Sequence, residues 1–129
     1  MEARNGGPIS MAAVMWVVYN RVGMPGFPKT LSAVVMQPNA FSWTRPDNSE
    51  HDLDPVVSTG EDLKMWYEAL LLAEEVLSGE YIDPTGGAHY YESPAATSGW
   101  FARNIAGPDL MGTAGHEFTV EIGGQRYYK

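Results

Sequence analysis

The first clear pattern is a run of apolar residues that recur at helical spacing near the start of the chain. Pro8 suits the first turn of a helix, where its missing N–H needs no partner. The positions that share one face are Ile9, Ala12, Ala13, Trp16, Val17 and Asn20. Further apolar residues extend around the circumference, namely Met11, Val14, Met15 and Val18. This pattern predicts a central helix buried on several sides, which Gly23 and Pro25 end.

Capping signals predict two more helices. Thr30 can cap a short helix over residues 31–36. Ser58 and Glu61 form a capping-box pattern ahead of a longer helix that Gly79 ends. The apolar positions at helical spacing in this longer helix are Leu63, Trp66, Leu70, Ala73 and Leu77. We expect this stripe, Trp66 included, to face the core.

Residues 38–59 are rich in Pro, Asn, Asp and Ser and show no steady period, which predicts a long loop. Loops of this length in compact domains are usually functional or disordered. Phe41 and Trp43 lie in this segment, followed by the acidic residues Asp47, Glu50, Asp52 and Asp54. We interpret the loop as one wall of a groove.

The last third of the chain predicts a small sheet. Residues 83–87 are a turn cluster, and residues 88–91 have the aromatic content of a short strand. Residues 117–122 and 125–128 predict a hairpin around the glycine pair 123–124.

Residues 98–102 favour a helical turn, and residues 106–115, which glycines interrupt, predict an irregular, mobile connection. No internal repeat or domain boundary is visible. With 129 residues the chain is long enough to bury a core without disulfides or structural metals. We therefore predict a single α+β domain over residues 1–129.

Composition excludes several classes of function. The formal net charge is −8 and no basic run occurs, so the positive surface that phosphate backbones require is missing and nucleic acid is not an expected partner. The chain has no Cys, which excludes disulfides and leaves the redox compartment open. The longest uncharged stretch, residues 5–20, is too short for a membrane span. No export signal is evident.

Several short motifs occur in order along the chain: Glu2–Pro8, Asn20–Val22, Gln37–Trp43, Asp83–Ala88, Tyr90–Tyr91 and Gly115–Phe118. In this order and spacing they resemble the catalytic domain of cell wall hydrolases of the spore cortex-lytic enzyme type, a group that includes phage peptidoglycan-cleaving proteins. The resemblance covers nearly the whole chain. It implies a small lysozyme-like fold, peptidoglycan as the substrate, and phage virion or lysis proteins as further partners to consider.

Glu2 is the candidate catalytic residue. A carboxyl group walled by apolar side chains has a raised pKa, which suits it to donate a proton to a glycosidic oxygen. The resemblance gives Glu2 the role of general acid/base in cleavage after N-acetylmuramic acid. Only Met1 precedes it, whereas the family usually has a helix there. A glycan-binding or phage structural module without turnover is therefore the alternative function.

The chain offers no obvious second carboxylate, which favours lytic transglycosylase chemistry over hydrolysis. Glu92 keeps hydrolysis open, because it is either that second carboxylate or a solvated strand residue. A third class, amidase or peptidase, has no visible nucleophile or metal motif. His51, His89 and His116 are scattered, so we expect no metal and no cofactor.

The resemblance also implies a set of substrate-binding residues: Gln37, Phe41, Trp43, Tyr90, Tyr91, Ser93 and His116. An amide can bind sugar hydroxyls or N-acetyl groups, and an aromatic face can pack on a sugar ring. Ser93 stands where the family has Asn, which shortens the reach of that side chain. Core packing is the alternative for Phe41 and both tyrosines, and a structural hydrogen bond is the alternative for His116.

Overall fold

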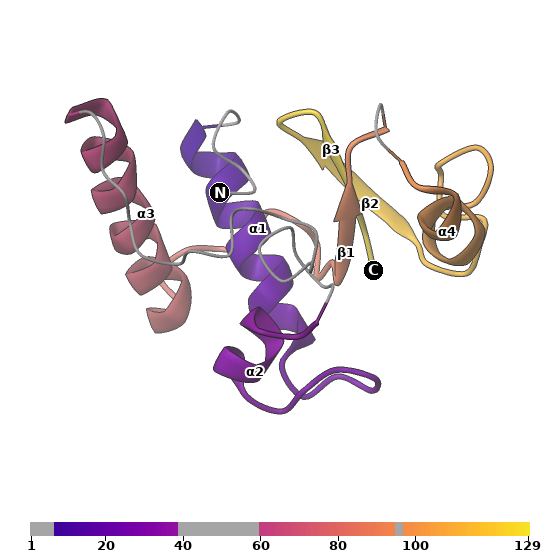
Figure 1. Cartoon of the computed structure of the whole chain (residues 1–129), viewed down its shortest axis with the longest axis horizontal. Coiled ribbons are helices and arrows are strands. Elements are labelled where there is room, and N and C mark those ends of the chain that lie inside the picture. The colour runs from indigo at the N-terminus through magenta and orange to yellow at the C-terminus, as the bar shows by residue number, and fades with distance from the viewer. Residues whose placement is uncertain (1–6, 39–59, 95–96) are drawn as a thin grey trace.

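The computed structural model describes residues 7–38, 60–94 and 97–129. Helix α1 lies between helix α3 on one side and a small sheet on the other (Figure 1). The elements are α1 (Gly7–Arg21), α2 (Leu31–Val35), α3 (Gly60–Ser78), β1 (Tyr90–Glu92), α4 (Gly99–Phe101), η5 (Ala102–Ala106), β2 (Phe118–Ile122) and β3 (Gln125–Tyr128). The α+β architecture predicted from the sequence is confirmed.

Helix α1 is the buried centre of the fold. Its buried apolar residues are Met11, Ala12, Ala13, Val14, Val17 and Val18. Their distribution around the helix confirms burial on several sides. Ile9 was expected on the buried face, but it is 51% exposed because the apolar clusters around α1 begin two residues later, at Met11. The helix ends as predicted before Gly23, which has a φ of +77°.

The residues predicted to begin and end α2 and α3 can be compared with the structure. Thr30 caps α2 as expected, because its hydroxyl accepts a hydrogen bond from the N–H of Ala33 at 3.3 Å. Gly79 ends α3 with a φ of +79°. The predicted capping box of α3 lies outside the description, which covers neither Ser58 nor the side chain of Glu61.

The predicted buried stripe of α3 is wrong in its rotation. Leu70 and Leu77 are 49% and 55% exposed, while Ala69 and Val76 are buried. Ala69 joins Met11 and Val14 in the cluster between α3 and α1. Because apolar residues surround this part of α3, several stripes satisfy the same period, and the close approach that a small Ala permits selects one of them. The side chains of Leu63 and Trp66 lie outside the description.

The sheet has the strand order β1-β3-β2, and all pairing is antiparallel. The β2–β3 hairpin turns at Gly123 and Gly124, whose φ values of +59° and +79° fit the two-residue turn predicted from the sequence. Strand β1 begins at Tyr90, two residues later than expected, and Tyr90 pairs with Tyr128. A register shift between Phe118 and Val120 marks an irregularity in β2.

The segment between β1 and β2 has more helix than expected. Helix α4 continues directly into the π-helical turn η5, so the predicted single turn is extended to Ala106. The next residues, 107–117, follow the irregular path that the glycines predicted. Backbone bonds hold this path, since the N–H groups of Gly112 and Thr113 both donate to the carbonyl of Ala106, at 2.7 and 3.1 Å.

Among the described residues the core contains four apolar clusters, and Tyr91 packs against three of them. Its ring stacks on that of Tyr127, with centroids 5.6 Å apart, in the layer between α1 and the sheet. A single aromatic residue from β1 thus connects the packing of α1 on α3, on α2 and on the sheet.

Candidate active site

The carboxylate of Asp83 joins the end of α1 to the turn that precedes β1. Asn20 Nδ2 donates to Asp83 Oδ2 at 2.9 Å and to the carbonyl of Ala88 at 3.1 Å. The backbone N–H and hydroxyl of Thr85 donate to Asp83 Oδ1 at 2.8 and 2.6 Å, and the N–H of Gly87 donates to Oδ2 at 3.0 Å. These bonds fix the loop that leads into β1.

Arg21, the last residue of α1, places a cation inside the protein. It is 7% exposed, and its Nε donates to the carbonyl of His89 at 2.6 Å. Its Cζ lies 5.2 Å from the centroid of the Phe27 ring and 5.7 Å from that of Tyr90, within the range of cation–π attraction. Burial lowers the pKa of the guanidinium from its ordinary value, and Tyr91 and Tyr90 oppose that change.

Tyr90 and His116, both predicted to bind substrate, lie against each other. Their ring centroids are 4.7 Å apart in an edge-to-face arrangement, and the Phe27 ring lies 5.8 Å from that of Tyr90. We call Arg21, Phe27, Tyr90 and His116 the aromatic cluster. It brings together the end of α1, the loop after it, the start of β1 and the loop before β2.

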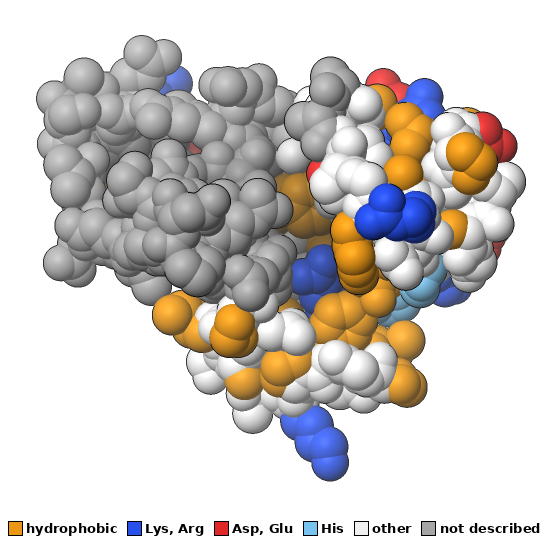
Figure 2. Space-filling model, turned by 45° about the vertical axis from the view of Figure 1, so that its right-hand side comes forward, with side chains coloured by type: hydrophobic (Ala, Val, Ile, Leu, Met, Phe, Trp, Pro, Cys, Tyr) orange, Lys and Arg blue, Asp and Glu red, His pale blue; other side chains and the backbone are white. Residues whose placement is uncertain are grey.

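The basic side chains of Arg21 and Lys129 lie near His89. Burial is the main cause that lowers the pKa of His89, and the neighbouring Arg21, Lys129 and His116 lower it further, while Asp83 opposes them. Neutral imidazole at position 89 is therefore favoured in the folded chain. Figure 2 shows hydrophobic side chains gathered on this side of the described part of the molecule, with basic and His side chains beside them.

Adjacent residues of β1 point to opposite faces, so the two tyrosines have different surroundings. Tyr90 contacts Phe27 and His116 and also packs against the buried cluster that contains Phe101 and Tyr128, whereas Tyr91 stacks on Tyr127. Both tyrosines are half-buried. The substrate-binding role of both tyrosines stays a prediction.

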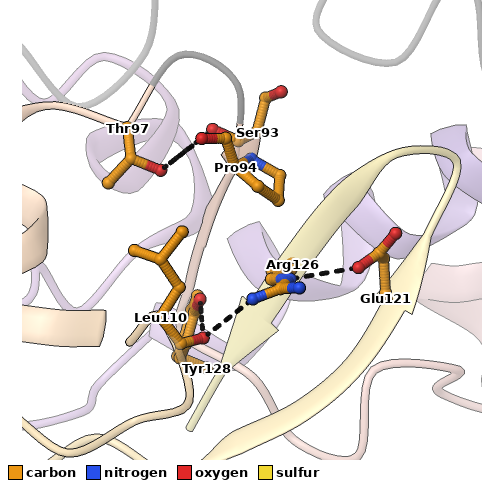
Figure 3. Close-up of polar contacts among 7 residues, drawn as sticks. All are labelled: Ser93, Pro94, Thr97, Leu110, Glu121, Arg126 and Tyr128. Atoms are coloured by element: carbon orange, nitrogen blue, oxygen red, sulfur yellow. Dashed lines mark hydrogen bonds and ion pairs between the residues drawn. The ribbon is translucent and has the colours of Figure 1, made fainter. Parts of the chain in front are cut away.

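Glu92 and Ser93 take part in local structure at the end of β1. Glu92 Oε1 accepts a hydrogen bond from the N–H of Ser98, the N-cap of α4, at 3.0 Å. Glu92 is half-buried and so is not simply a solvated strand residue. The carbonyl of Ser93 accepts a hydrogen bond from the hydroxyl of Thr97 at 3.0 Å, and Figure 3 shows the two residues side by side with Pro94.

Gln37 follows the short helix α2, and its side chain has an unusual feature. Its Oε1 is buried and has no hydrogen-bond partner among the residues that the structure describes. An unpaired buried acceptor costs about 1–3 kcal/mol, so such a group in a native fold asks for an explanation. Ser10 Oγ and Trp16 Nε1 of α1 share this feature, so it does not by itself mark Gln37 as a ligand contact.

Three predicted site residues, Glu2, Phe41 and Trp43, lie outside the described residues. The structure therefore brings together Tyr90 and His116 and places Tyr91, Ser93 and Gln37 elsewhere on the described framework. Sequence reasoning missed Arg21 and Phe27 as members of the cluster. The available signal for Arg21 was its place in the Asn20–Val22 motif.

Within residues 7–38, 60–94 and 97–129, no group of three or more His, Asp or Glu side chains is placed to hold a metal ion. Over the same ranges, no helix has both the length and the apolar character needed to cross a membrane.

A family model described as "Cell Wall Hydrolase" matches residues 6–119. The chain therefore belongs to the cell wall hydrolase family, as the motifs predicted.

Two relatives are spore cortex-lytic enzymes. The chain is 35% identical over 101 residues to that of Halalkalibacterium halodurans and 33% identical over 102 residues to that of Oceanobacillus iheyensis. In both comparisons 77% of this chain is covered, but only 26% and 31% of the relatives' own length. The chain thus corresponds to less than a third of these proteins.

Two solved structures are similar over nearly the whole chain. The catalytic domain of the germination-specific lytic transglycosylase SleB from Bacillus anthracis matches with a TM-score of 0.67 at 27% identity, covering 99% of this chain and 84% of that one. The catalytic domain of the Bacillus cereus SleB protein matches with a TM-score of 0.66 at 27% identity, covering 99% and 80%. The predicted lysozyme-like fold is confirmed by this likeness.

Proposed function

We propose that this chain cleaves the glycan strands of peptidoglycan between N-acetylmuramic acid and N-acetylglucosamine by lytic transglycosylase chemistry. The observation that carries the proposal is the structural likeness over 99% of the chain to a domain described as a lytic transglycosylase. Residues 1–129 then act as one catalytic domain.

Glu2 is the general acid and base in this proposal, an assignment that rests on the resemblance of its motif. The protonated carboxyl of Glu2 gives its proton to the glycosidic oxygen as the bond from C1 of the muramic acid breaks. The 6-hydroxyl of the same sugar then bonds to C1, and the Glu2 carboxylate accepts the hydroxyl proton. The products are a 1,6-anhydro sugar and a free N-acetylglucosamine hydroxyl, and no water is consumed.

The described residues supply candidate contacts for the glycan. Gln37 belongs to the proposed set through the family resemblance, since an amide can bind sugar hydroxyls or N-acetyl groups. Tyr90 and His116 present an aromatic face and an imidazole side by side. Phe41, Trp43, Tyr91 and Ser93 complete the proposed substrate-binding set on the strength of the family resemblance.

Glu92 is the candidate second carboxylate that would distinguish hydrolysis from transglycosylation. A hydrolase needs a second carboxylate that is available to activate water or to bond to the sugar. Glu92 Oε1 accepts the N–H of Ser98 at the start of α4, and the Glu92→Gln variant in the test below decides between the two reactions. Phage virion or lysis proteins as partners rest on the resemblance alone.

The test is mass spectrometry of the soluble products after purified peptidoglycan is incubated with the parent chain, with Glu2→Gln and with Glu92→Gln. We expect anhydro-muropeptides, one water lighter than hydrolysis products, from the parent and from Glu92→Gln. Loss of the Glu2 carboxyl should lower the yield at least about 100-fold, because general acid–base catalysis typically contributes that much or more.

Other product patterns have defined meanings. Reducing-end products that disappear in Glu92→Gln would establish hydrolysis and overturn the proposed chemistry. If no variant releases product but the parent is retained on insoluble peptidoglycan, the chain is a glycan-binding module. Neither products nor retention would refute peptidoglycan as the substrate.

A further inference from the structure

The backbone of Leu110 is held in a conformation that its side chain disfavours. Its φ is +60°, and it is the one non-glycine residue with positive φ among the described residues. Left-handed backbone costs a residue with a Cβ roughly 1–2 kcal/mol, so surrounding contacts must hold it there. Those contacts are visible at its carbonyl.

Two side chains of strand β3 donate to the carbonyl oxygen of Leu110. The hydroxyl of Tyr128 lies 2.8 Å from it and Nη1 of Arg126 lies 3.4 Å from it, as the dashed lines in Figure 3 mark. We call these two bonds the Leu110 clamp. The clamp links the end of the sheet to a loop that has no strand pairing of its own.

Both donors have further contacts. Tyr128 is 1% exposed, and its ring packs edge-on against Phe101 and Phe118, at centroid distances of 5.6 and 5.9 Å. Arg126 Nε forms an ion pair with Glu121 Oε2 at 3.1 Å, and its Cζ lies 5.8 Å from the Phe118 ring. The clamp therefore ties the position of the Leu110 carbonyl to strands β2 and β3.

The clamped loop leads directly to His116. Beyond Leu110, the N–H of Gly112 donates to the carbonyl of Ala106 at 2.7 Å. On the far side of His116, the carbonyl of Glu117 accepts the N–H of Lys129 at 2.7 Å. The imidazole lies between these anchors, with its ring 4.7 Å from that of Tyr90.

We infer that Tyr128 and Arg126 are positioning residues for glycan binding: through the Leu110 carbonyl they hold the 107–117 loop so that His116 and Tyr90 present one surface to the sugar. The inference deepens the proposed function and rests on it. It assigns a role in substrate affinity to two β3 residues that the motifs of the chain do not include.

The structure offers a matched control for Tyr128. Tyr127 is also fully buried on β3, but its hydroxyl donates to Gln125 Oε1 at 3.2 Å, within the same strand. Tyr127→Phe and Tyr128→Phe each remove one buried hydroxyl and keep the ring. Only the second removes a bond to the loop.

The first arm of the test needs no glycan. The NMR resonances of the His116 ring C–H groups report the ring current of Tyr90, and their assignment follows from their loss in His116→Ala. We expect them to move toward the shifts of a solvated histidine in Tyr128→Phe and to stay in place in Tyr127→Phe. Resonances unchanged in Tyr128→Phe would overturn the clamp.

The second arm measures affinity for purified insoluble peptidoglycan at a temperature where all variants are folded. Tyr128→Phe should bind about fivefold more weakly than Tyr127→Phe, as expected for the loss of one hydrogen bond worth about 1 kcal/mol. In a His116→Ala background the two variants should bind equally. An equal affinity of the two single variants would overturn the positioning role.

The two arms separate the inference from the proposed function. If the parent chain does not bind peptidoglycan, the proposed function fails and the role of the clamp in glycan affinity fails with it. The His116 resonances still decide, in that case, whether the clamp positions the loop.

Discussion

The contact of α1 with α3 and the region from β1 to β3 are stabilised in different ways. Between the helices, Met11, Val14 and Ala69 form a buried apolar cluster that depends on volume and period. In the C-terminal region, buried tyrosine hydroxyls and backbone groups form directed hydrogen bonds, such as that from Tyr128 to Leu110. The first kind of packing tolerates many sequences, whereas the second fixes particular atoms.

The same contrast is seen at the surface. Leu71 of α3 is 61% exposed, as an apolar residue outside the packed stripe can be. Tyr127 and Tyr128, at the end of the chain, are almost completely buried although each carries a polar hydroxyl. The candidate site residues Tyr90 and His116 lie in the region of directed bonds, which is where a binding surface needs its atoms fixed.

The largest expected effect comes from adding one methyl group at Gly112. Its φ is +87°, and a Cβ there would clash with the carbonyl oxygen of His116 and lie 2.6 Å from the backbone N of Phe118. Gly112→Ala should lower the free energy of unfolding by about 4 kcal/mol, as strain and overpacking add. Urea denaturation measures the change.

Gly124→Ala is the matched control for that substitution. Its φ is +79°, but nothing lies within 4 Å of a Cβ at that position. The expected loss is about 1 kcal/mol, from backbone strain alone. Equal losses at the two glycines would show that close packing of the 107–117 loop does not stabilise the C-terminal region.

The helical contact should respond to volume instead. Met11→Ala leaves a cavity between α1 and α3 and should cost about 3 kcal/mol of unfolding free energy. Met11→Leu keeps most of the volume and should cost less than about 1.5 kcal/mol. Thermal unfolding followed by circular dichroism compares the two, and a loss for Leu as large as that for Ala would contradict a volume-dependent interface.

The smallest of the three effects concerns the junction of the two regions. Asp83→Asn keeps the shape of the side chain but replaces one acceptor oxygen by an N–H₂ group that faces donors. The expected loss is about 2 kcal/mol of unfolding free energy in urea denaturation, since charge-assisted bonds are lost.

Asp109→Asn is the control for the junction. Asp109 also accepts bonds from nearby residues, the N–H of Met111 at 3.1 Å and the hydroxyl of Thr113 at 3.0 Å, but it is exposed. We expect a much smaller change there, because water replaces the lost bonds. A loss at Asp109 that matches the loss at Asp83 would argue against a special role of the α1 junction.

Much of the fold could be predicted because local signals and the final structure agree. The period of α1, the Thr30 cap of α2 and the glycine turn at residues 123–124 each reappear in the structure. The rotation of α3 could not be predicted, since apolar residues at neighbouring positions give several equivalent stripes. Leu70 was assigned to the core on that basis and is half-exposed.

The candidate site was predicted in part. Tyr90 and His116 were named from their motifs, and the structure places their rings in contact. The burial of Arg21 was not foreseen, because a charged residue at a helix end is usually solvated. Its cation–π partners, Phe27 and Tyr90, come from other segments, and no pattern in α1 indicates them.

Helix period, caps, turns and short motifs are properties of neighbouring residues, so the local elements and the family could be predicted from the sequence. The buried face of α3, the contact of Tyr90 with His116 and the bond from Tyr128 to the carbonyl of Leu110 appear only in the folded chain. These outcomes depend on contacts between segments far apart in the chain. Such contacts are selected by the packing of the whole domain and not by local preference.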